Sequence, residues 1–339
     1  MKKNRKNKKR NIFLKFIFIF LLFFLILIVS NVKMINNISF GLSIHHQKYW
    51  VGGKYKLLNN ICLNSSIEKI YLKISNNRIE ELPDGYFLMK SSGRECITAY
   101  TRNRNSKICL TIYNTPELIF KETNPIKIET NNVKQLNLLL RDYPKLNVKF
   151  ISNHPDIIKV NNEGKINSIR PGNAIITAIG LDGKKTQIKV VALSNNGLIN
   201  NYILDQNNAS QYQKVMIVAH PDDETLWGGA HLIKERYFVV CLTNGYNLDR
   251  ANDYREILKF TKNNGLILNH PDLQDNIIDD WSVFGEGVEK DLSKIIKYKS
   301  WEEIVTHGPD GTTGHIHHKK ICEYITKITN ECNKYKNLY

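Results

Sequence analysis

The sequence lacks the cysteine spacings by which proteins hold structural zinc. It contains no Cys-x-x-Cys pair and no zinc-finger pattern among its six cysteines, Cys62, Cys96, Cys109, Cys241, Cys322 and Cys332. This absence argues against a zinc finger. In an exported chain, a pair among the first three can oxidise to a disulfide. Cys241 follows the apolar residues 238–240 and is predicted to be a small core residue.

Acidic residues are few beside basic ones: 32 Asp and Glu stand against 48 Lys and Arg, a net charge of +16. Such an excess is typical of nucleic-acid-binding proteins, but its distribution decides its meaning. The densest cluster lies in the first ten residues, at Lys2, Lys3, Arg5, Lys6, Lys8, Lys9 and Arg10. We therefore predict no nucleic-acid partner and assign this cluster to membrane topology.

Charge is almost absent from Ile12–Val32, where Lys15 near the start is the single charged residue. About 20 apolar residues suffice to cross a bilayer as a helix. We predict an uncleaved single-pass anchor at 12–32, with the basic tail 1–11 in the cytoplasm and the rest of the chain outside. A cleaved signal peptide is the alternative, but no small-x-small cleavage site follows Val29.

Residues 43–195 have little helical periodicity and indicate short strands separated by turns. Part of the pattern occurs twice at one constant offset: Gly85, Gly93, Thr98 and Ala99 correspond to Gly164, Gly172, Thr177 and Ala178. We predict one small β-sandwich used twice, over 43–115 and 117–195.

The second copy contains "ISNHPDIIKVNNEGKINSIRPGNAIITA", residues 151–178. This stretch resembles the bacterial Ig-like (group 2) domains of surface proteins. The first copy is more degenerate, with Ser92-Gly93 in place of Pro171-Gly172. The resemblance implies a spacer or an adhesive stalk. We expect a spacer, because no aromatic cluster marks a sugar site.

From Lys214 onward the pattern changes to alternating strands and helices. Strands are predicted at 214–219, 237–243 and 302–307, and helices at 226–236, 249–265 with Gly265 as the C-cap, 291–299 and 319–332. The alternation predicts an α/β, Rossmann-like domain over 212–339, with a parallel sheet and helices on its faces. In such sheets the site lies at the carboxyl ends of the strands.

Two polar clusters follow predicted strand ends. "AHPDDE" places His220, Asp222 and Asp223 after the first strand, and "THGPDGTTGHIHHKK" carries four of the ten histidines, His307, His315, His317 and His318. Carboxylates at a helix start can simply cap it. Capping explains neither the preceding histidine nor the second cluster.

A catalytic metal explains both clusters. Zinc takes three nitrogen or oxygen ligands and keeps one position for water, so His220, Asp223 and one histidine of the second cluster form a complete set. The ion lowers the pKa of its water to about 7. Asp222 is then a spare carboxylate for general-base work, and a second histidine can stabilise the oxyanion. Zinc is the default metal, although this ligand set also admits iron, cobalt or manganese.

These residues resemble the zinc-dependent PIG-L/LmbE-type de-N-acetylases, whose signature is "AHPDDE" plus a distal His-x-x-His in a Gly-rich loop. The similarity covers about 212–330 and includes the spacing of Glu256 and Gly265. Members remove acetyl groups from N-acetylglucosamine-type sugars. The resemblance implies metal ligands, a general base and an oxyanion-stabilising acid, carried here by His220, Asp223 and His318, by Asp222 and by His315 respectively. Glu224 is expected to anchor the loop, and His307 to make a structural hydrogen bond.

The sequence departs from the family pattern at several positions. His317 stands where relatives often have an aspartate that orients the catalytic histidine, Asp253 where many have a substrate-contacting arginine, and Thr313 where some have a tyrosine. The domain is also expected to be shortened at its C-terminus. Such a form is either an enzyme with an open site, suited to polymeric sugar, or a compromised one.

The sequence thus predicts a membrane-anchored, extracytoplasmic zinc N-deacetylase on two Ig-like modules, acting on an N-acetylated glycan or glycolipid. A catalytically inactive glycan-binding surface protein is the principal alternative. A metal-dependent peptide deacylase is the third.

Overall fold

The structure is a computed structural model, described here at residues 21, 48–57, 71–100, 105–139 and 148–332. It divides into two compact units, 1–115 and 116–339. The predicted basic tail lies outside the described residues, as does the predicted anchor apart from Leu21. Within the described part of the chain, no helix combines the length and the apolarity needed to cross a bilayer.

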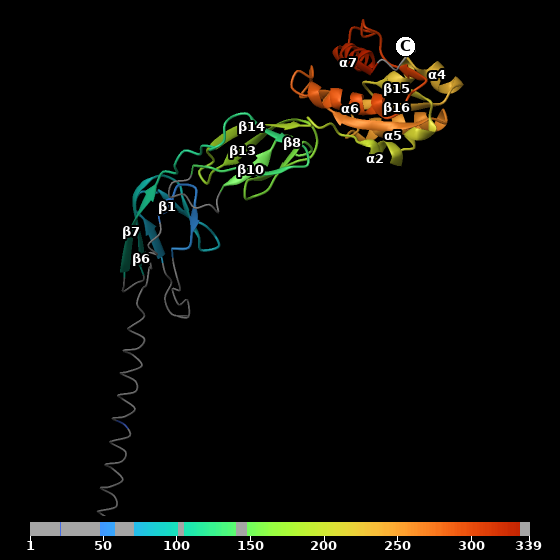
Figure 1. The fold of residues 1–339 in the computed structure, drawn as a ribbon. Coiled ribbons are helices and arrows are strands. Elements are labelled where there is room, and N and C mark those ends of the chain that lie inside the picture. The colour runs from blue at the N-terminus through green and yellow to red at the C-terminus, as the bar shows by residue number, and fades with distance from the viewer. Residues whose placement is uncertain (1–20, 22–47, 58–70, 101–104, 140–147, 333–339) are drawn as a thin grey trace, which may run out of the picture. The chain divides into compact units, whose positions relative to one another are not determined.

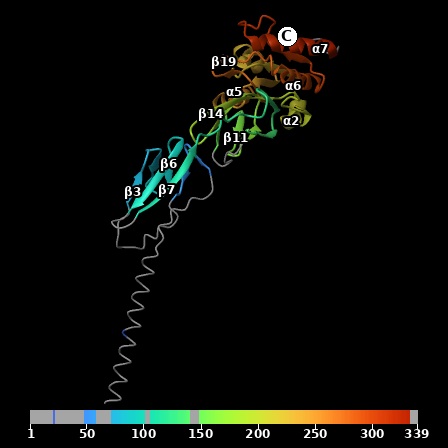
Figure 2. The same cartoon turned by 90° about the vertical axis from the view of Figure 1, so that its left-hand side faces the viewer.

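From residue 48 onward, the described residues of the first unit form β-strands and their connections. Its four-stranded sheet has the order β1-β7-β6-β3, and Figure 2 shows β3, β6 and β7 side by side. A three-stranded sheet, β2-β5-β4, completes the sandwich around Phe87, Met89 and Ile97, which are fully buried. The strands are β1 Tyr49–Trp50, β2 Lys54–Tyr55, β3 Tyr71–Ile74, β4 Ile79–Glu81, β5 Phe87–Met89, β6 Gly93–Tyr100 and β7 Asn105–Tyr113.

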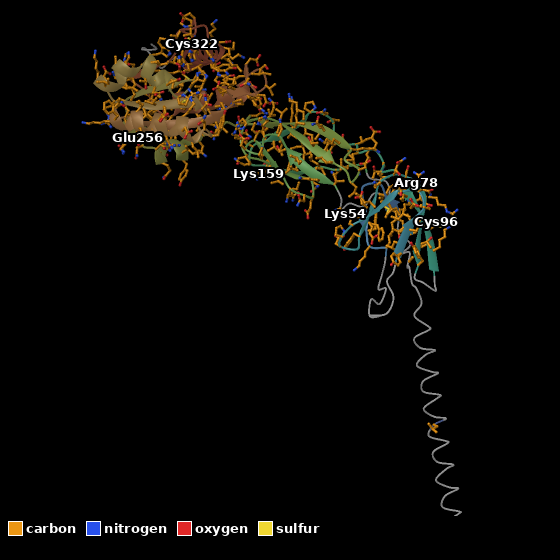
Figure 3. The ribbon with its side chains drawn as sticks, turned by 180° about the vertical axis from the view of Figure 1, so that it is seen from behind. Lys54, Arg78, Cys96, Lys159, Glu256 and Cys322 are labelled. Carbon is orange, nitrogen blue, oxygen red and sulfur yellow. A yellow bond between two sulfur atoms is a disulfide. The ribbon has the colours of Figure 1, made fainter. Side chains whose placement is uncertain are left out.

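A disulfide joins Cys96 of β6 to Cys109 of β7, which are directly paired neighbours in the sheet (Figure 3). The pairing falls among the three cysteines predicted to contribute a disulfide. Cys241 is a free thiol with no exposed surface, as predicted for a core residue.

The second unit begins with a β-sandwich that repeats this topology (Figure 1). Its sheets have the orders β8-β14-β13-β10 and β9-β12-β11. Gly85 and Gly164 have φ of 77° and 80°, so the repeated glycines occupy equivalent left-handed turns. The strands are β8 Ile126–Glu129, β9 Val133–Gln135, β10 Lys149–Ser152, β11 Ile158–Val160, β12 Lys165–Ser168, β13 Gly172–Ile179 and β14 Lys185–Leu193.

The rest of the second unit is an α/β domain. Its parallel sheet has the order β17-β16-β15-β20, so the strand order reverses beside β15. The strands are β15 Lys214–Val218, β16 Tyr237–Thr243, β17 Asn264–His270 and β20 Glu303–Val305, and β18 Leu273–Gln274 and β19 Ile277–Ile278 form a hairpin. The helices are α2 Asn201–Gln206, the 3-10 turn η2 Ala209–Gln211, α3 Asp223–Leu226, α4 Gly229–Lys234, α5 Leu248–Phe260, α6 Gly285–Lys297 and α7 Ile316–Cys332.

Helices cover both faces of this sheet. Apolar residues of α6 and α7 pack on one face, against Val215, Ile217 and the even-numbered residues of β16. Leu232 of α4 and Tyr254 and Leu258 of α5 pack on the other. The predicted α/β architecture is therefore confirmed: β15 after Lys214 and the whole of β16 are buried, as expected for parallel strands covered on both faces.

Two local predictions were wrong. The helix expected over 226–236 is interrupted at Gly228, where a Cβ would lie 2.6 Å from the methyl group of Met216. Gly265 is not a helix cap but part of β17, a strand that the sequence analysis missed. A Cβ at Gly265 would lie 1.9 Å from the carbonyl oxygen of Val239, so this glycine permits close pairing of β16 and β17.

Candidate metal centre

The first cluster lies where β15 ends and α3 begins, at the carboxyl edge of the sheet. The backbone N–H of His220 donates to Oδ2 of Asp223 at 2.8 Å and closes the loop. The carboxylate of Glu224 accepts from the backbone N–H of Asp222 and the hydroxyl of Thr225. Glu224 is buried and anchors this loop, consistent with its expected role.

The second cluster enters from the first turn of α7. His318 Nε2 lies 3.3 Å from His220 Nδ1 and 3.2 Å from Asp223 Oδ2, and His220 Nδ1 lies 3.3 Å from the same oxygen. The three predicted ligand residues, two from the first cluster and one about a hundred residues later, therefore form one triangle and are all buried.

The ring nitrogens that face away from this triangle have partners of their own. His318 Nδ1 donates to the backbone carbonyl oxygen of Gly311 at 3.1 Å, which leaves a lone pair on Nε2. His220 Nε2 lies 3.0 Å from His317 Nδ1, so its other nitrogen is also free to face the triangle. When both imidazoles are neutral with their hydrogens on these outward nitrogens, three electron-rich atoms face one another, an arrangement that favours a bound cation, either a metal ion or a proton.

Zinc fits this geometry. Bonds of about 2.0–2.1 Å in a tetrahedron place neighbouring ligand atoms about 3.3–3.4 Å apart, close to the observed 3.2–3.3 Å. Burial opposes charge on His220, but the carboxylates of Asp223 and Asp272 outweigh it and raise its pKa to about 9. Burial likewise raises the pKa of Asp223, and the close rings of His220 and His318 more than reverse this. Without metal, His220 therefore holds a proton at the position where a metal cation would fit.

Asp222 lies beside the triangle in an unusual backbone conformation. Its φ of 150° is one that side-chain-bearing residues rarely adopt, and such strain concentrates at functional sites. Its carboxylate is half-exposed, and the guanidinium of Arg250 donates to it at 3.1 Å and to the carbonyl oxygen of Pro221 at 2.9 Å. Burial raises the pKa of Asp222, although Arg250 opposes the shift.

A cavity of about 350 Å³ opens over the triangle. All five predicted site residues line it, together with Arg250, Asp272, Thr313 and the apolar side chains of Leu226, Trp227, Leu273 and Ile278. Asp253 is not among the lining residues. The arginine that reaches this cavity is therefore Arg250, three residues earlier in the chain.

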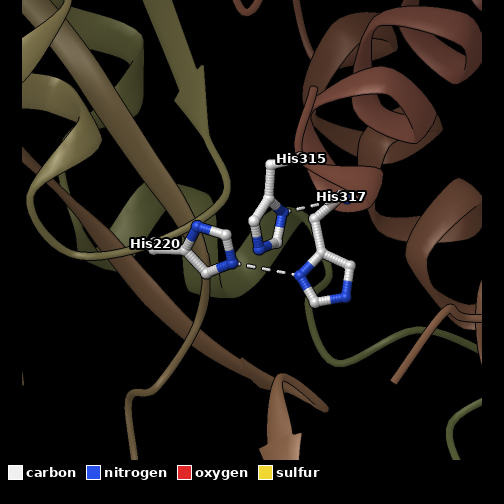
Figure 4. Close-up of side chains that lie close together, drawn as sticks. All are labelled: His220, His315 and His317. Carbon is white, nitrogen blue, oxygen red and sulfur yellow. Dashed lines mark hydrogen bonds between the residues drawn. The ribbon is translucent and has the colours of Figure 1, made fainter. Parts of the chain in front are cut away.

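His315 presents one nitrogen to the cavity. Its Nδ1 accepts the backbone N–H of His317 at 3.2 Å, so in the neutral ring the hydrogen is on Nε2 (Figure 4). Burial and the neighbouring His220 lower the pKa of His315 and favour this neutral form. His315 can therefore donate a hydrogen bond into the cavity.

His307 is packed behind the ligands. The backbone N–H of Ala219 donates to its Nε2 at 3.0 Å, and its ring stacks on His318 with centroids 3.7 Å apart. Burial lowers the pKa of His307 to about 4, so the ring is neutral at pH 7. The expected structural hydrogen bond is present.

The sequence analysis missed three residues near the triangle: Asp272, its partner Asn244, and Trp281, which stacks on His317. Asp272 lies 3.4 Å from His220 Nε2, accepts from Asn244 at 2.7 Å, and has a pKa lowered to about 2 because these contacts outweigh burial. Asp272 ends the tripeptide His270-Pro271-Asp272, which starts at the last residue of β17, and the same tripeptide occurs at 220–222 just after β15. The tripeptide also occurs at 154–156, so it is not specific by itself.

Glu256, whose spacing supports the family resemblance, lies on the exposed side of α5 (Figure 3). Its carboxylate is 3.7 Å from the Lys259 ammonium group and does not line the cavity.

Residues 215–329, about a third of the chain, match the family model of PIG-L, described as GlcNAc-PI de-N-acetylase. The match supports a de-N-acetylase-like hydrolase domain and agrees with the resemblance found in the sequence. An uncharacterized protein of Acanthamoeba polyphaga mimivirus is 28% identical over 152 residues, which are 40% of this chain and 66% of that protein. The chain thus spans slightly less than two thirds of that relative.

Solved structures give only weak likenesses. Domains 4 and 5 of the S-layer protein SbsC are 16% identical, with 36% of this chain and 70% of that chain covered and a TM-score of 0.19. Invasin, a bacterial integrin-binding protein, is 16% identical over 37% and 31%, with a TM-score of 0.22. A GH10 xylanase from termite gut that contains a bacterial Ig-like domain is 15% identical over 64% and 61%, with a TM-score of 0.19. At these scores the likenesses carry no argument.

Proposed function

We propose that the α/β domain is a zinc-dependent N-deacetylase that hydrolyses the acetamido group of an N-acetylglucosamine-type sugar. The observation that carries this proposal is the triangle of His220, Asp223 and His318, in which two imidazole nitrogens and one carboxylate oxygen converge at 3.2–3.3 Å. The PIG-L match over the same residues supports the reaction class.

Each predicted residue has a place in this reaction. His220, Asp223 and His318 would hold the zinc ion, which would make an activated water available at neutral pH. Asp222 would take the proton of the attacking water, and Arg250 holds the carboxylate of Asp222 at the cavity. The Nε2–H of His315 would donate to the developing oxyanion. Asp222 would then return the proton to the departing amine, leaving acetate and a free amino sugar.

Several features support a cell-surface role for this activity. The Cys96–Cys109 disulfide favours an oxidising compartment, and the basic residues before 12–32 favour an outward-facing chain. We therefore propose an extracytoplasmic domain, held by an anchor at 12–32, that acts on a surface glycan or glycolipid. Proteolysis of intact cells tests this topology: we expect loss of an epitope placed at the C-terminus, and its full protection would refute the proposal.

Acetate release tests the proposed chemistry. The zinc-loaded protein should release acetate from N-acetylglucosamine oligomers, and Asp222→Asn should abolish release, because an amide cannot accept the proton of the water. We expect that Asp253→Asn, outside the cavity, retains activity. Tight oligomer binding without acetate would favour the inactive surface lectin, and turnover only of acetylated peptides would favour a peptide deacylase.

A further inference from the structure

His317 is the metal-site neighbour at which this chain departs from the family pattern. Its backbone N–H reaches His315, but its side chain makes its hydrogen bonds elsewhere. Nδ1 lies 3.0 Å from His220 Nε2 (Figure 4), and Nε2 faces the backbone carbonyl oxygen of Asp279. The ring has no exposed surface.

The direction of each hydrogen bond in this chain follows from the carbonyl at its end. A carbonyl oxygen can only accept, so His317 Nε2 carries a hydrogen and donates it to Asp279. In the neutral imidazole, Nδ1 is then an acceptor. Its partner, His220 Nε2, must donate. Neutral His220 therefore has its lone pair on Nδ1, the atom that faces Asp223 and His318.

We propose that His317 is a positioning residue for the metal: it fixes His220 as the Nε2–H tautomer and thereby directs Nδ1 to the ion. This inference rests on the proposed metal site. It also distinguishes two histidine-containing groups that could hold an ion, His220–Asp223–His318 and His220–His315–His317. In the second group, His220 and His317 use the facing nitrogens on each other, so the first group binds the metal.

Trp281 holds the His317 ring in this orientation. The two rings are stacked, with centroids 4.1 Å apart and planes inclined by 8°. The indole N–H of Trp281 donates to the carbonyl oxygen of Pro271 at 2.7 Å, which fixes the tryptophan in turn. Trp281 has a φ of 56°, a strained value for a bulky residue. The stack on His317 and the hydrogen bond to Pro271 hold Trp281 in this backbone conformation.

A second acceptor lies near the same nitrogen of His220. Oδ1 of Asp272 is 3.4 Å from His220 Nε2, longer than an ordinary hydrogen bond, whereas His317 is at 3.0 Å. Partners of metal-bound histidines typically change affinity by about 10–100-fold when they are replaced. Because Asp272 can take over part of the role, we expect the lower end of this range for His317.

Zinc affinity of the metal-stripped, full-length protein tests the proposal by competition with a chromophoric chelator. His317→Leu leaves His220 Nε2–H without its acceptor and should raise the Kd about tenfold. His317→Asn places an amide oxygen near the position of Nδ1 and should restore affinity to within about threefold. His231→Asn, at an exposed histidine of α4, is the control and should bind as the unaltered protein.

The tautomer itself is measured by ¹⁵N NMR of the imidazoles in the zinc-loaded, unaltered protein. We expect His220 to bind zinc through Nδ1 and to carry hydrogen on Nε2, with His317 protonated on Nε2 and not bound to zinc. Binding through His220 Nε2, or full zinc affinity in a folded His317→Leu protein, would overturn the proposal. Both measurements omit substrate, so an inactive protein that shows this tautomer refutes the proposed deacetylase alone.

Discussion

His318 is a proposed zinc ligand, whereas His315 is a neighbour that lines the same cavity. Replacing each histidine separately tests this difference. Ring centroids of the two histidines are only 4.9 Å apart, yet their nitrogens face different partners. His318 Nε2 belongs to the triangle, whereas His315 Nδ1 accepts a backbone N–H. We therefore expect the same substitution to have very different effects on zinc affinity: a large loss for His318→Ala and little change for His315→Ala.

The magnitude follows from the number of ligands. Four protein ligands bind structural zinc with about 10–16 kcal/mol, or roughly 3 kcal/mol for each ligand. At about 1.4 kcal/mol for each tenfold change, losing His318 should weaken zinc binding about 100-fold. Losing His315 frees one backbone N–H, which water can satisfy, and should change the Kd by less than about threefold.

Chelator competition on the metal-stripped protein measures both constants, with His231→Ala as the exposed control. Metal-free thermal unfolding of each variant checks that the fold survives. If His315→Ala weakened zinc binding as strongly as His318→Ala, the metal would lie between His220, His315 and His317, and the reasoning from hydrogen positions would be refuted.

Three further predictions concern pH and stability. The metal-free protein should lose stability as the pH falls from 6.5 to about 4. Burial lowers the pKa values of His307 and His317 to about 4. In this pH range, therefore, only the unfolded chain binds protons at these two histidines. The free energy of unfolding should change by up to about 1.4 kcal/mol per pH unit for each histidine. Urea titrations of His307→Asn at several pH values should show a smaller dependence on pH, and an unchanged dependence would contradict the account. Glu95→Gln should cost about 3 kcal/mol in the first unit, because the buried carboxylate accepts from the backbone of Ser75, Asn76 and Arg78 and an amide offers one acceptor fewer. An unchanged first-unit transition in calorimetry would disprove this. Gly265→Ala should destabilise the α/β domain by about 3 kcal/mol or more, because the new methyl group meets the backbone of Val239. If urea denatured this variant and the unaltered protein at the same concentration, β16 and β17 could move apart to admit the methyl group, and the prediction would be wrong.

Much of the α/β fold could be predicted because its two central strands, β15 and β16, are largely apolar runs. Residues 237–243 were predicted as a strand with the observed bounds, since every side chain in β16 is buried. β17 escaped prediction because only its later residues are well buried and it begins with Asn264-Gly265. The reason for Gly265, close approach to Val239, is a tertiary contact that no local pattern reveals.

The candidate site was predictable where sequence spacing met strand ends. His220 and Asp223 follow a strand and lie three residues apart, which places both on one loop. The direction of the His317 side chain was not predictable, because it depends on the carbonyl of Asp279, 38 residues away. Asp272 and Trp281 were missed for another reason: both follow β17, the strand that the sequence analysis did not recognise.

Anomalous diffraction at the zinc edge, from crystals of the zinc-loaded protein, tests the central claim most directly. The account predicts one zinc ion at about 2.0–2.2 Å from His220 Nδ1, Asp223 Oδ2 and His318 Nε2, with a fourth position open to the cavity. An ion bound by His315 or His317 instead, or a triangle that stays empty at saturating zinc, would contradict it.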